Sequence, residues 1–316
     1  MKLESIEKAK ICLVVVTYNR KELLKENLNS LINQNIKCDI LVVDNNSNDG
    51  TDSLVKDFQK EYSNIIYIKL DENVGGAGGF YNGVSKAYEL KYDFVVLMDD
   101  DGHPINNNTI RNLIELYYKE DNKKVMINSI VYSDYNTKTL SFGMLGANNL
   151  EELKEKIKDG KIEGAINPFN GTLLTKELIK DIGYPKKEFF ISGDETEYTL
   201  RARKNGYKIM TAVSSEYYHP SAKYKIKKVF GKEIKMRSSI SIWRRYYYAR
   251  NYSFINKKYY RVGRQIKNII KQLLESIFLV EKPLIAIKYT LLGIIDGYRE
   301  KFVNDKHINE KLQKKC

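Results

Sequence analysis

The sequence lacks the features that mark disulfide-bonded, signal-bearing and membrane-spanning proteins. Its cysteines, Cys12, Cys38 and Cys316, are scattered and form no CxxC pair. This spacing indicates neither a disulfide framework nor a cysteine zinc site, and it fits a reducing cytoplasm. The first residues have no long apolar core with a small-residue cleavage site, so we expect no signal peptide. No window reaches the roughly 18 uninterrupted apolar residues of a membrane span.

The composition is that of a globular protein, but the charge is unevenly distributed. Of the 316 residues, 42% are hydrophobic and 29% charged, which excludes wholesale disorder. The formal net charge is +13, yet residues 221–271 alone contain sixteen Lys or Arg and one acidic residue, Glu233. This basic block indicates an anionic partner: nucleic acid, phospholipid head groups or a phosphate-bearing substrate.

Short apolar runs alternate with helical patterns in the first third of the chain. The runs are too short for helices and read as buried strands, and the segments between them have apolar residues at helical spacing. This alternation predicts βαβ units and a mostly parallel, doubly wound α/β sheet. The predicted strands cover residues 11–16, 39–44, 65–68 and 94–98.

The strand at 94–98 runs directly into three carboxylates, Asp99, Asp100 and Asp101, followed by Gly102. Adjacent carboxylates repel one another unless water or a cation screens them, and clustered carboxylate oxygens are preferred ligands of hard divalent ions. The alternative is a solvated acidic loop.

A glycine-rich segment precedes the helix before that strand. Glycines there allow close backbone approach, and a helix N-terminus suits a phosphate. The alternative is a tight turn that packs the helix against the sheet. Because strand ends on the carboxyl edge converge on the ligand crevice, Asp44, this segment and the Asp triplet should lie along one edge. Its candidate residues are Asn73, Gly75, Gly76, Gly78 and Gly79.

The second half of the chain is less regular. Asp194, Glu195 and Glu197 begin a predicted helix, where the alternative role is to complement the helix dipole. Beyond residue 221 the chain is basic and rich in tyrosine, and residues 269–298 are mainly apolar with interspersed charges. This pattern suits helices on an anionic membrane surface. The alternative is a helical subdomain whose basic face is only solvated.

Seven short motifs occur in order along the chain: Val14–Asn19, Leu41–Ser47, Asn73–Phe80, Leu97–Asp101, Phe189–Phe190 with Gly193–Arg201, Gly206–Tyr207, and His219. Taken together, these motifs resemble family 2 glycosyltransferases over residues 10–255. The GGAGGF segment (residues 75–80) and the Asp triplet are similar to the galactofuranosyltransferase and rhamnosyltransferase-like branch.

The resemblance implies a GT-A fold, a Rossmann-like sheet with an acceptor-binding half. The catalytic domain would span residues 1–220, with a nucleotide-binding half to about residue 105 and an acceptor half over about 106–220. A basic, tyrosine-rich helical region would occupy 221–316.

The resemblance also assigns roles to residues. Thr17 and Asp44 would contact the nucleotide, and the segment from Asn73 to Gly79 would close around the donor sugar and diphosphate. Asp99, Asp101 and His219 would hold Mn²⁺ or Mg²⁺, and Asp100 would face the donor. The family's catalytic base is the second residue of an acidic pair, here Glu195 after Asp194. Because the usual residue there is Asp, the choice between the two stays open.

The implied reaction is an inverting, metal-dependent transfer from a nucleotide sugar to a lipid-linked or polysaccharide acceptor in cell-surface glycan synthesis. UDP-galactofuranose is the favoured donor and dTDP-rhamnose the runner-up. We expect a cytoplasmic enzyme, peripheral on the inner face of the cell membrane.

Two other functions would explain part of the sequence. A sugar-phosphate nucleotidyltransferase usually needs a basic residue in its glycine-rich loop, and residues 72–83 contain none. A nucleic-acid-binding protein would use the basic, aromatic block, but would leave the acidic triplet and glycine segment unexplained. We therefore expect no nucleic-acid partner.

Overall fold

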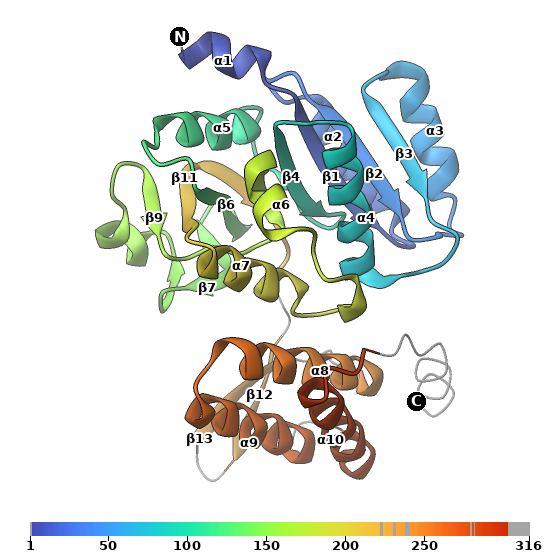
Figure 1. The fold of residues 1–316 in the computed structure, drawn as a ribbon, viewed down its shortest axis with the longest axis vertical. Helices are drawn as coiled ribbons and strands as arrows, with labels where there is room; N and C mark the ends of the chain where they lie inside the picture. Colours follow the sequence, from blue (N-terminus) through green and yellow to red (C-terminus); the bar gives the residue numbers. More distant parts are fainter. Residues whose placement is uncertain are drawn as a thin grey trace. The chain divides into compact units, whose positions relative to one another are not determined.

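The computed structural model describes residues 2–221, 224–229, 232–237, 241–278, 280 and 282–302. The chain packs into two compact units, shown in Figure 1. The first contains Met1–Pro185 and Tyr198–Ser221, and the second contains Lys186–Glu197 and Ala222–Cys316. The second unit therefore includes residues 186–197, which the sequence-based division placed in the acceptor half.

The first unit is built on one mixed sheet with strand order β3-β2-β1-β4-β10-β6-β11-β5. β1, β2, β3 and β4 are mutually parallel neighbours, and their Val, Ile and Leu runs suit strands buried on both faces. The main strands are β1 (Ile11–Thr17), β2 (Asp39–Asp44), β3 (Ile65–Lys69), β4 (Phe94–Asp99), β5 (His103–Pro104), β6 (Val125–Asp134), β10 (Asn170–Thr175) and β11 (Lys208–Tyr218).

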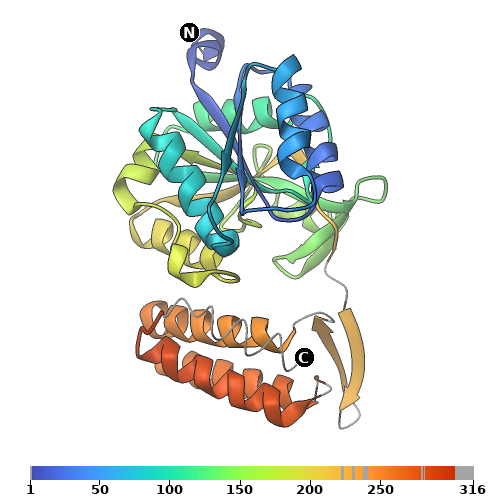
Figure 2. The same cartoon turned by 90° about the vertical axis from the view of Figure 1, so that its right-hand side faces the viewer.

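Helices cover both faces of this sheet, as Figure 2 shows. On one face the core includes Leu28 of α2 and Leu113 of α5, and on the other Val84 of α4 and Ile179 of α6. The predicted α/β sheet is confirmed. The helices are α1 (Lys2–Lys8), α2 (Lys21–Ile32), α3 (Thr51–Glu61), α4 (Gly75–Glu89), α5 (Thr109–Lys119), α6 (Lys176–Ile182) and α7 (Asp194–Lys204).

The sheet is not parallel throughout. β10 runs antiparallel between β4 and β6, whereas β6 and β11 are again parallel. The parallel group β1–β4 is therefore joined to the rest through one reversed strand. Smaller elements complete this unit: β7 (Thr139–Met144), β8 (Ala147–Asn149), η1 (Glu151–Lys156) and β9 (Lys161–Glu163).

The region after residue 221, predicted to be helical, begins instead with two strands in the second unit. An antiparallel hairpin of β12 and β13 precedes three helices, which are the helical region that the sequence predicted. α10 packs so closely on α8 that a Cβ atom on Gly297 would overlap the backbone of Arg250. Among the described residues, no helix is long and apolar enough to span a membrane. The elements are η2 (Lys187–Phe189), β12 (Tyr224–Val229), β13 (Lys232–Arg237), α8 (Ile242–Tyr259), α9 (Val262–Phe278) and α10 (Pro283–Tyr298).

Candidate active site

Strand register brings three predicted site residues to one edge of the sheet. Thr17 at the end of β1 is paired with Asp44 at the end of β2. Val16 is paired with Asp99, the last residue of β4. Because these strands are parallel, their carboxyl ends meet at the same edge.

Asp100 is held in place by the loop that follows β1. The Thr17 hydroxyl donates to its Oδ2 at 2.8 Å, and the Arg20 guanidinium donates to its Oδ1 at 3.0 Å. The same Arg20 nitrogen lies 2.7 Å from Asp101 Oδ2. Sequence reasoning did not single out Arg20, although it is the first cation after β1. Its charge offsets part of the repulsion within the triplet.

The turn after the triplet is fixed from two further sides. The buried amide of Asn27 on α2 donates to the carbonyl oxygen of Gly102. Tyr217 lies on the other side of the turn, so close that a Cβ atom on Gly102 would come within 3.0 Å of the Tyr217 hydroxyl. That hydroxyl is buried, with no hydrogen-bond partner among the residues that the structure describes. Burial and the three Asp charges raise the Tyr217 pKa well above its usual value, so it stays protonated.

His219 reaches the triplet because β11 ends beside it. Tyr217 and Tyr218 pair with the short strand β5, which begins two residues after Asp101. The backbone N–H of His219 donates to the Tyr132 carbonyl oxygen at 3.0 Å. His219 is thereby placed next to a carboxylate more than a hundred residues earlier in the chain.

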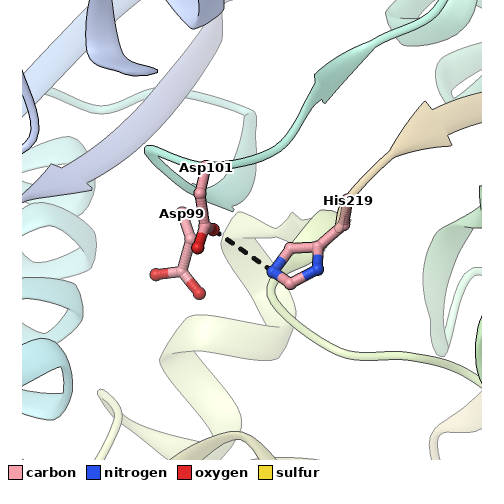
Figure 3. A group of neighbouring side chains, drawn as sticks. All are labelled: Asp99, Asp101 and His219. Carbon is pink, nitrogen blue, oxygen red and sulfur yellow. Dashed lines mark ion pairs between the residues drawn. The ribbon is translucent and has the colours of Figure 1, made fainter. Parts of the chain in front are cut away.

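Asp99, Asp101 and His219 converge on one point, as Figure 3 shows. One ligand atom from each lies within 4.8 Å of the other two. His219 Nε2 is 3.2 Å from Asp101 Oδ1, and its Nδ1 is 2.7 Å from the Pro220 carbonyl oxygen. A proton on Nδ1 would satisfy that carbonyl and leave the Nε2 lone pair directed at the carboxylates.

This arrangement fits a divalent cation. Asp101 Oδ1 is buried without a well-formed hydrogen bond from any described residue. With a neutral imidazole, Oδ1 and Nε2 would be two acceptors facing each other, so a cation or a proton is needed between them. Carboxylate oxygens with one imidazole nitrogen are a ligand set suited to Mn²⁺ and, with more oxygen ligands, to Mg²⁺.

The electrostatics show the same need for positive charge. Burial, together with the charges of Asp101 and Asp100, raises the pKa of Asp99 to about 7. Burial also raises the pKa of Asp100 to about 6, although Arg20 and Thr17 oppose it. Burial would raise the pKa of Asp101 as well, but His219 and Arg20 outweigh it and lower that pKa.

Asp44, predicted to contact the nucleotide, is buried and hydrogen-bonded within the protein. Its carboxylate is fully buried and accepts hydrogen bonds from the Ser47 backbone N–H at 2.8 Å and from the Tyr67 hydroxyl at 2.7 Å. Here the carboxylate shapes the turn after β2. The role of Asp44 toward a nucleotide stays a prediction.

The glycine-rich segment is the first part of α4, not a loop ahead of it. Asn73 Oδ1 accepts from the Gly75 N–H at 2.8 Å, and Gly75 has a positive φ of 73°. A Cβ on Gly79 would overlap Val16 of β1, so α4 packs closer to the sheet than any larger residue would allow. Gly76 differs, because a Cβ there would meet nothing within 4 Å. The helix-packing alternative therefore accounts for Gly79.

The acidic pair opens α7 and belongs to the second unit. Asp194 is buried, with 5% of its surface exposed, whereas Glu195 is half-buried. Glu195 Oε2 accepts a hydrogen bond from the Gly193 N–H at 3.0 Å. A general base has to reach its substrate, so this difference in exposure favours Glu195.

The backbone before the pair is sharply turned and tied to α8. Phe190, Ser192 and Gly193 all have positive φ, which is unusual for residues with side chains. The buried Asn251 amide donates to the carbonyl oxygens of three residues of this segment, at 2.8 to 3.0 Å. Arg250 donates to the Glu188 and Phe189 carbonyl oxygens.

Known proteins with similar sequences are glycosyltransferases. The chain is 27% identical over 252 residues to galactofuranosyltransferase GlfT1 of Mycolicibacterium smegmatis, covering 78% of this chain and 82% of that one. It is 25% identical over 294 residues to the dTDP-rhamnosyl transferase RfbF of Shigella flexneri, covering 90% and 94%.

Solved structures share the fold at low sequence identity. A mannosyltransferase from Pyrobaculum calidifontis, in complex with GDP-Man and Mn²⁺, superposes with a TM-score of 0.53 at 16% identity, covering 96% of this chain and 78% of that one. GalNAc-T7 with UDP, GalNAc and Mn²⁺ gives 0.61 at 13% identity, covering 92% and 56%. The fold is therefore GT-A. The model of glycosyl transferase family 2 matches residues 12–183, more than half of the chain, and the chain belongs to that family.

Proposed function

We propose that this glycosyltransferase moves a sugar from a nucleotide-sugar donor to an acceptor hydroxyl, with inversion and with a divalent cation, Mn²⁺ or Mg²⁺. The observation that carries the proposal is the convergence of Asp99, Asp101 and His219 within 4.8 Å. These three residues would hold the cation. When bound, the cation would stabilise the negative charge that develops on the leaving diphosphate.

The other residues at the edge prepare the donor site. Thr17 and Arg20 hold the Asp100 carboxylate in one orientation, so that it can accept a hydrogen bond from a donor hydroxyl without reorganising. The N-terminus of α4, with Asn73, Gly75, Gly76 and Gly78, would supply backbone N–H groups and positive dipole toward the diphosphate. Asp44 and Thr17 would lie on the nucleoside side.

Glu195 would take the proton from the attacking hydroxyl. Direct attack on the anomeric carbon inverts its configuration and needs a general base but no covalent enzyme intermediate. The half-buried Glu195 suits this role better than the buried Asp194. Asp194 would then order the start of α7.

We propose UDP-galactofuranose as the donor, with dTDP-rhamnose as the second candidate. The similarity to a galactofuranosyltransferase supports the first, and the similarity to a dTDP-rhamnosyl transferase over 90% of the chain supports the second.

The acceptor would be lipid-linked or a growing surface glycan. The basic block of residues 221–271 would bring the enzyme to an anionic membrane, on the inner face of the cell membrane, where such acceptors are held. Because this attraction to the membrane is electrostatic, binding of the enzyme to anionic membranes should weaken at high salt.

A donor screen tests the proposal. Purified protein is incubated with Mn²⁺ and each of a panel of nucleotide sugars, and released nucleotide is quantified with and without lipid-linked acceptors. We expect UDP-galactofuranose to be consumed and EDTA to stop its consumption. Consumption of dTDP-rhamnose alone would select the second donor, and turnover of no nucleotide sugar would overturn the proposed function.

A further inference from the structure

Helix α9 exposes an aliphatic stripe that a helix on the surface of a soluble protein would usually bury. Five of its large aliphatic side chains are exposed at helical spacing, and Ile269 and Leu273 are half-buried. The buried positions are polar instead, with Gln272 and Ser276 exposing 5% and 0%. The outward residues and their exposed fractions are Val262 (67%), Ile266 (53%), Ile270 (51%), Leu274 (47%) and Ile277 (44%).

Hydrogen bonds explain why uncharged polar residues of α9 are turned inward. Ser276 Oγ lies 2.8 Å from Thr290 Oγ1 of α10 and accepts from Arg245 of α8 at 3.2 Å. The Asn268 amide donates to Asn256 Oδ1 of α8 at 2.8 Å. These bonds anchor α9 to both neighbouring helices. Its rotation is therefore set by specific contacts, and the outward direction of its aliphatic residues is built into the unit.

Helix α10 also exposes aliphatic side chains. Its packed face is formed mainly by small residues, including Ala286 and Gly293, together with Ile294, and a Cβ on Gly293 would overlap the backbone of Tyr246. Four of its other aliphatic residues are exposed. We call the exposed residues of the two helices the α9–α10 apolar surface: Val262, Ile266, Ile270, Leu274 and Ile277 with Leu284 (82%), Leu291 (42%), Leu292 (41%) and Ile295 (45%).

Cations accompany this surface. Arg264, Lys267 and Lys271 of α9 are all exposed. At 3.6 residues per turn they follow one border of the aliphatic stripe. Glu275 is the acidic residue of this helix, and it lies 3.9 Å from Lys271. An aliphatic stripe bordered by Lys and Arg is the pattern of helices that lie in the plane of an anionic bilayer surface.

We propose that the α9–α10 apolar surface inserts into the interface of an anionic lipid bilayer, with Arg264, Lys267 and Lys271 at the level of the head groups. A second copy of the chain fits less well, because an antiparallel two-fold contact through α9 would bring the same cations of both copies together. The inference deepens the membrane association within the proposed function, since it names the contacting surface.

Vesicle co-sedimentation tests this inference. The full chain is mixed with vesicles of phosphatidylcholine and phosphatidylglycerol, or of phosphatidylcholine alone. We expect binding to the anionic vesicles and a fall in the partition coefficient of about tenfold or more for the double variant Ile266→Gln, Ile270→Gln, because two aliphatic side chains no longer leave water. The control Leu145→Gln changes an exposed aliphatic residue of the first unit (55% exposed) and should bind like the unchanged protein.

A second variant guards against misfolding of the first. Lys267→Glu, Lys271→Glu keeps the aliphatic stripe and should also lose binding to anionic vesicles, with a nearly unchanged melting temperature. Absence of binding by the unchanged protein, or full binding by both variants, would overturn the inference. So would a dimer in sedimentation that the Ile variant abolishes while vesicle binding persists. The assay contains no nucleotide sugar, and the inactive Asp101→Asn variant should bind normally, so failure of the proposed function would be seen separately.

Discussion

At the scale of single residues, the candidate site is a set of carboxylates placed where they repel one another. Burial and mutual repulsion raise the pKa of Asp99 to about 7, and Asp101 Oδ1 is buried beside an imidazole nitrogen. Arg20 compensates only part of this charge, since it contacts Asp100 and Asp101. The close carboxylates repel one another, and a bound cation would offset this repulsion.

Replacement of Asp101 by Asn should remove the negative charge of one proposed cation ligand with little change in shape. We expect Mn²⁺-dependent donor turnover to fall by at least about a hundredfold, as loss of metal affinity predicts. Turnover and Mn²⁺ titration calorimetry provide the measurements. The control is Asp57→Asn, an exposed residue paired with Lys60 on α3, which should change neither. Normal Mn²⁺ dependence in the Asp101 variant would contradict the assigned ligand set.

Glu195→Gln separates catalysis from binding. The amide keeps the size of the side chain but cannot accept a proton, so transfer should fall by about 10²- to 10⁴-fold while the donor dissociation constant stays nearly unchanged. Asp194→Asn is made in parallel. If the Glu195 variant keeps its activity and the Asp194 variant loses it, Asp194 is the base.

At the scale of elements, the glycines of α4 are explained by two different demands. Gly79 faces β1, where a Cβ would overlap Val16, whereas Gly76 faces open space. Gly79→Ala should therefore lower the free energy of unfolding by about 1–3 kcal/mol through overpacking. Gly76→Ala, the matched control, should leave it unchanged or raise it by about 0.5–1 kcal/mol. Urea unfolding measures both, and equal effects would refute the packing argument.

Asn251 fixes the turn before the acidic pair. Asn251→Asp preserves volume but removes the amide that donates to three carbonyl oxygens. We expect the free energy of unfolding to fall by about 1–3 kcal/mol and kcat to fall with little change in donor KM, because Glu195 would lose its fixed position. Asn205→Asp, at an exposed position, is the control. A loss of stability with unchanged kcat would show that the bracing is structural only.

At the scale of the whole molecule, cation binding should be visible as stability. A ligand that binds only the native state stabilises it by about 2.7 kcal/mol at a concentration of 100 times its Kd. Mn²⁺ should therefore raise the melting temperature, and EDTA should reverse the increase. Asp101→Asn should abolish the shift. An equal shift in that variant would place the stabilising ion elsewhere.

The first half of the fold could be predicted because its signals are local. Val and Leu runs ending at Thr17, Asp44 and Asp99 mark buried parallel strands, and parallel strands bring their carboxyl ends together. The three proposed cation ligands followed from the family resemblance, and the structure places them together. Their supports, Arg20, Asn27 and Tyr217, escaped notice because nothing in their local sequence shows that they face the triplet.

Other features arise only from contacts between distant segments. Nothing in the composition of β10 shows that this strand is reversed, since strand direction is set by pairing with neighbouring strands and not by composition. The glycines of α4 suggested a loop, because glycine lowers the stability of a helix and this effect can be read from the sequence. The close approach of α4 to β1, which requires Gly79, is a contact between distant segments and cannot be read from it.

The secondary structure of this protein thus follows from the alternation of apolar runs and helical patterns, which depends on neighbours within a few residues. Which face of each helix or strand is buried depends on its contacts in the tertiary structure. The composition of α9 shows an aliphatic stripe, and by the usual rule it would be buried. The hydrogen bonds of Ser276 and Asn268 to α8 and α10 turn that stripe outward, because buried polar groups must find partners.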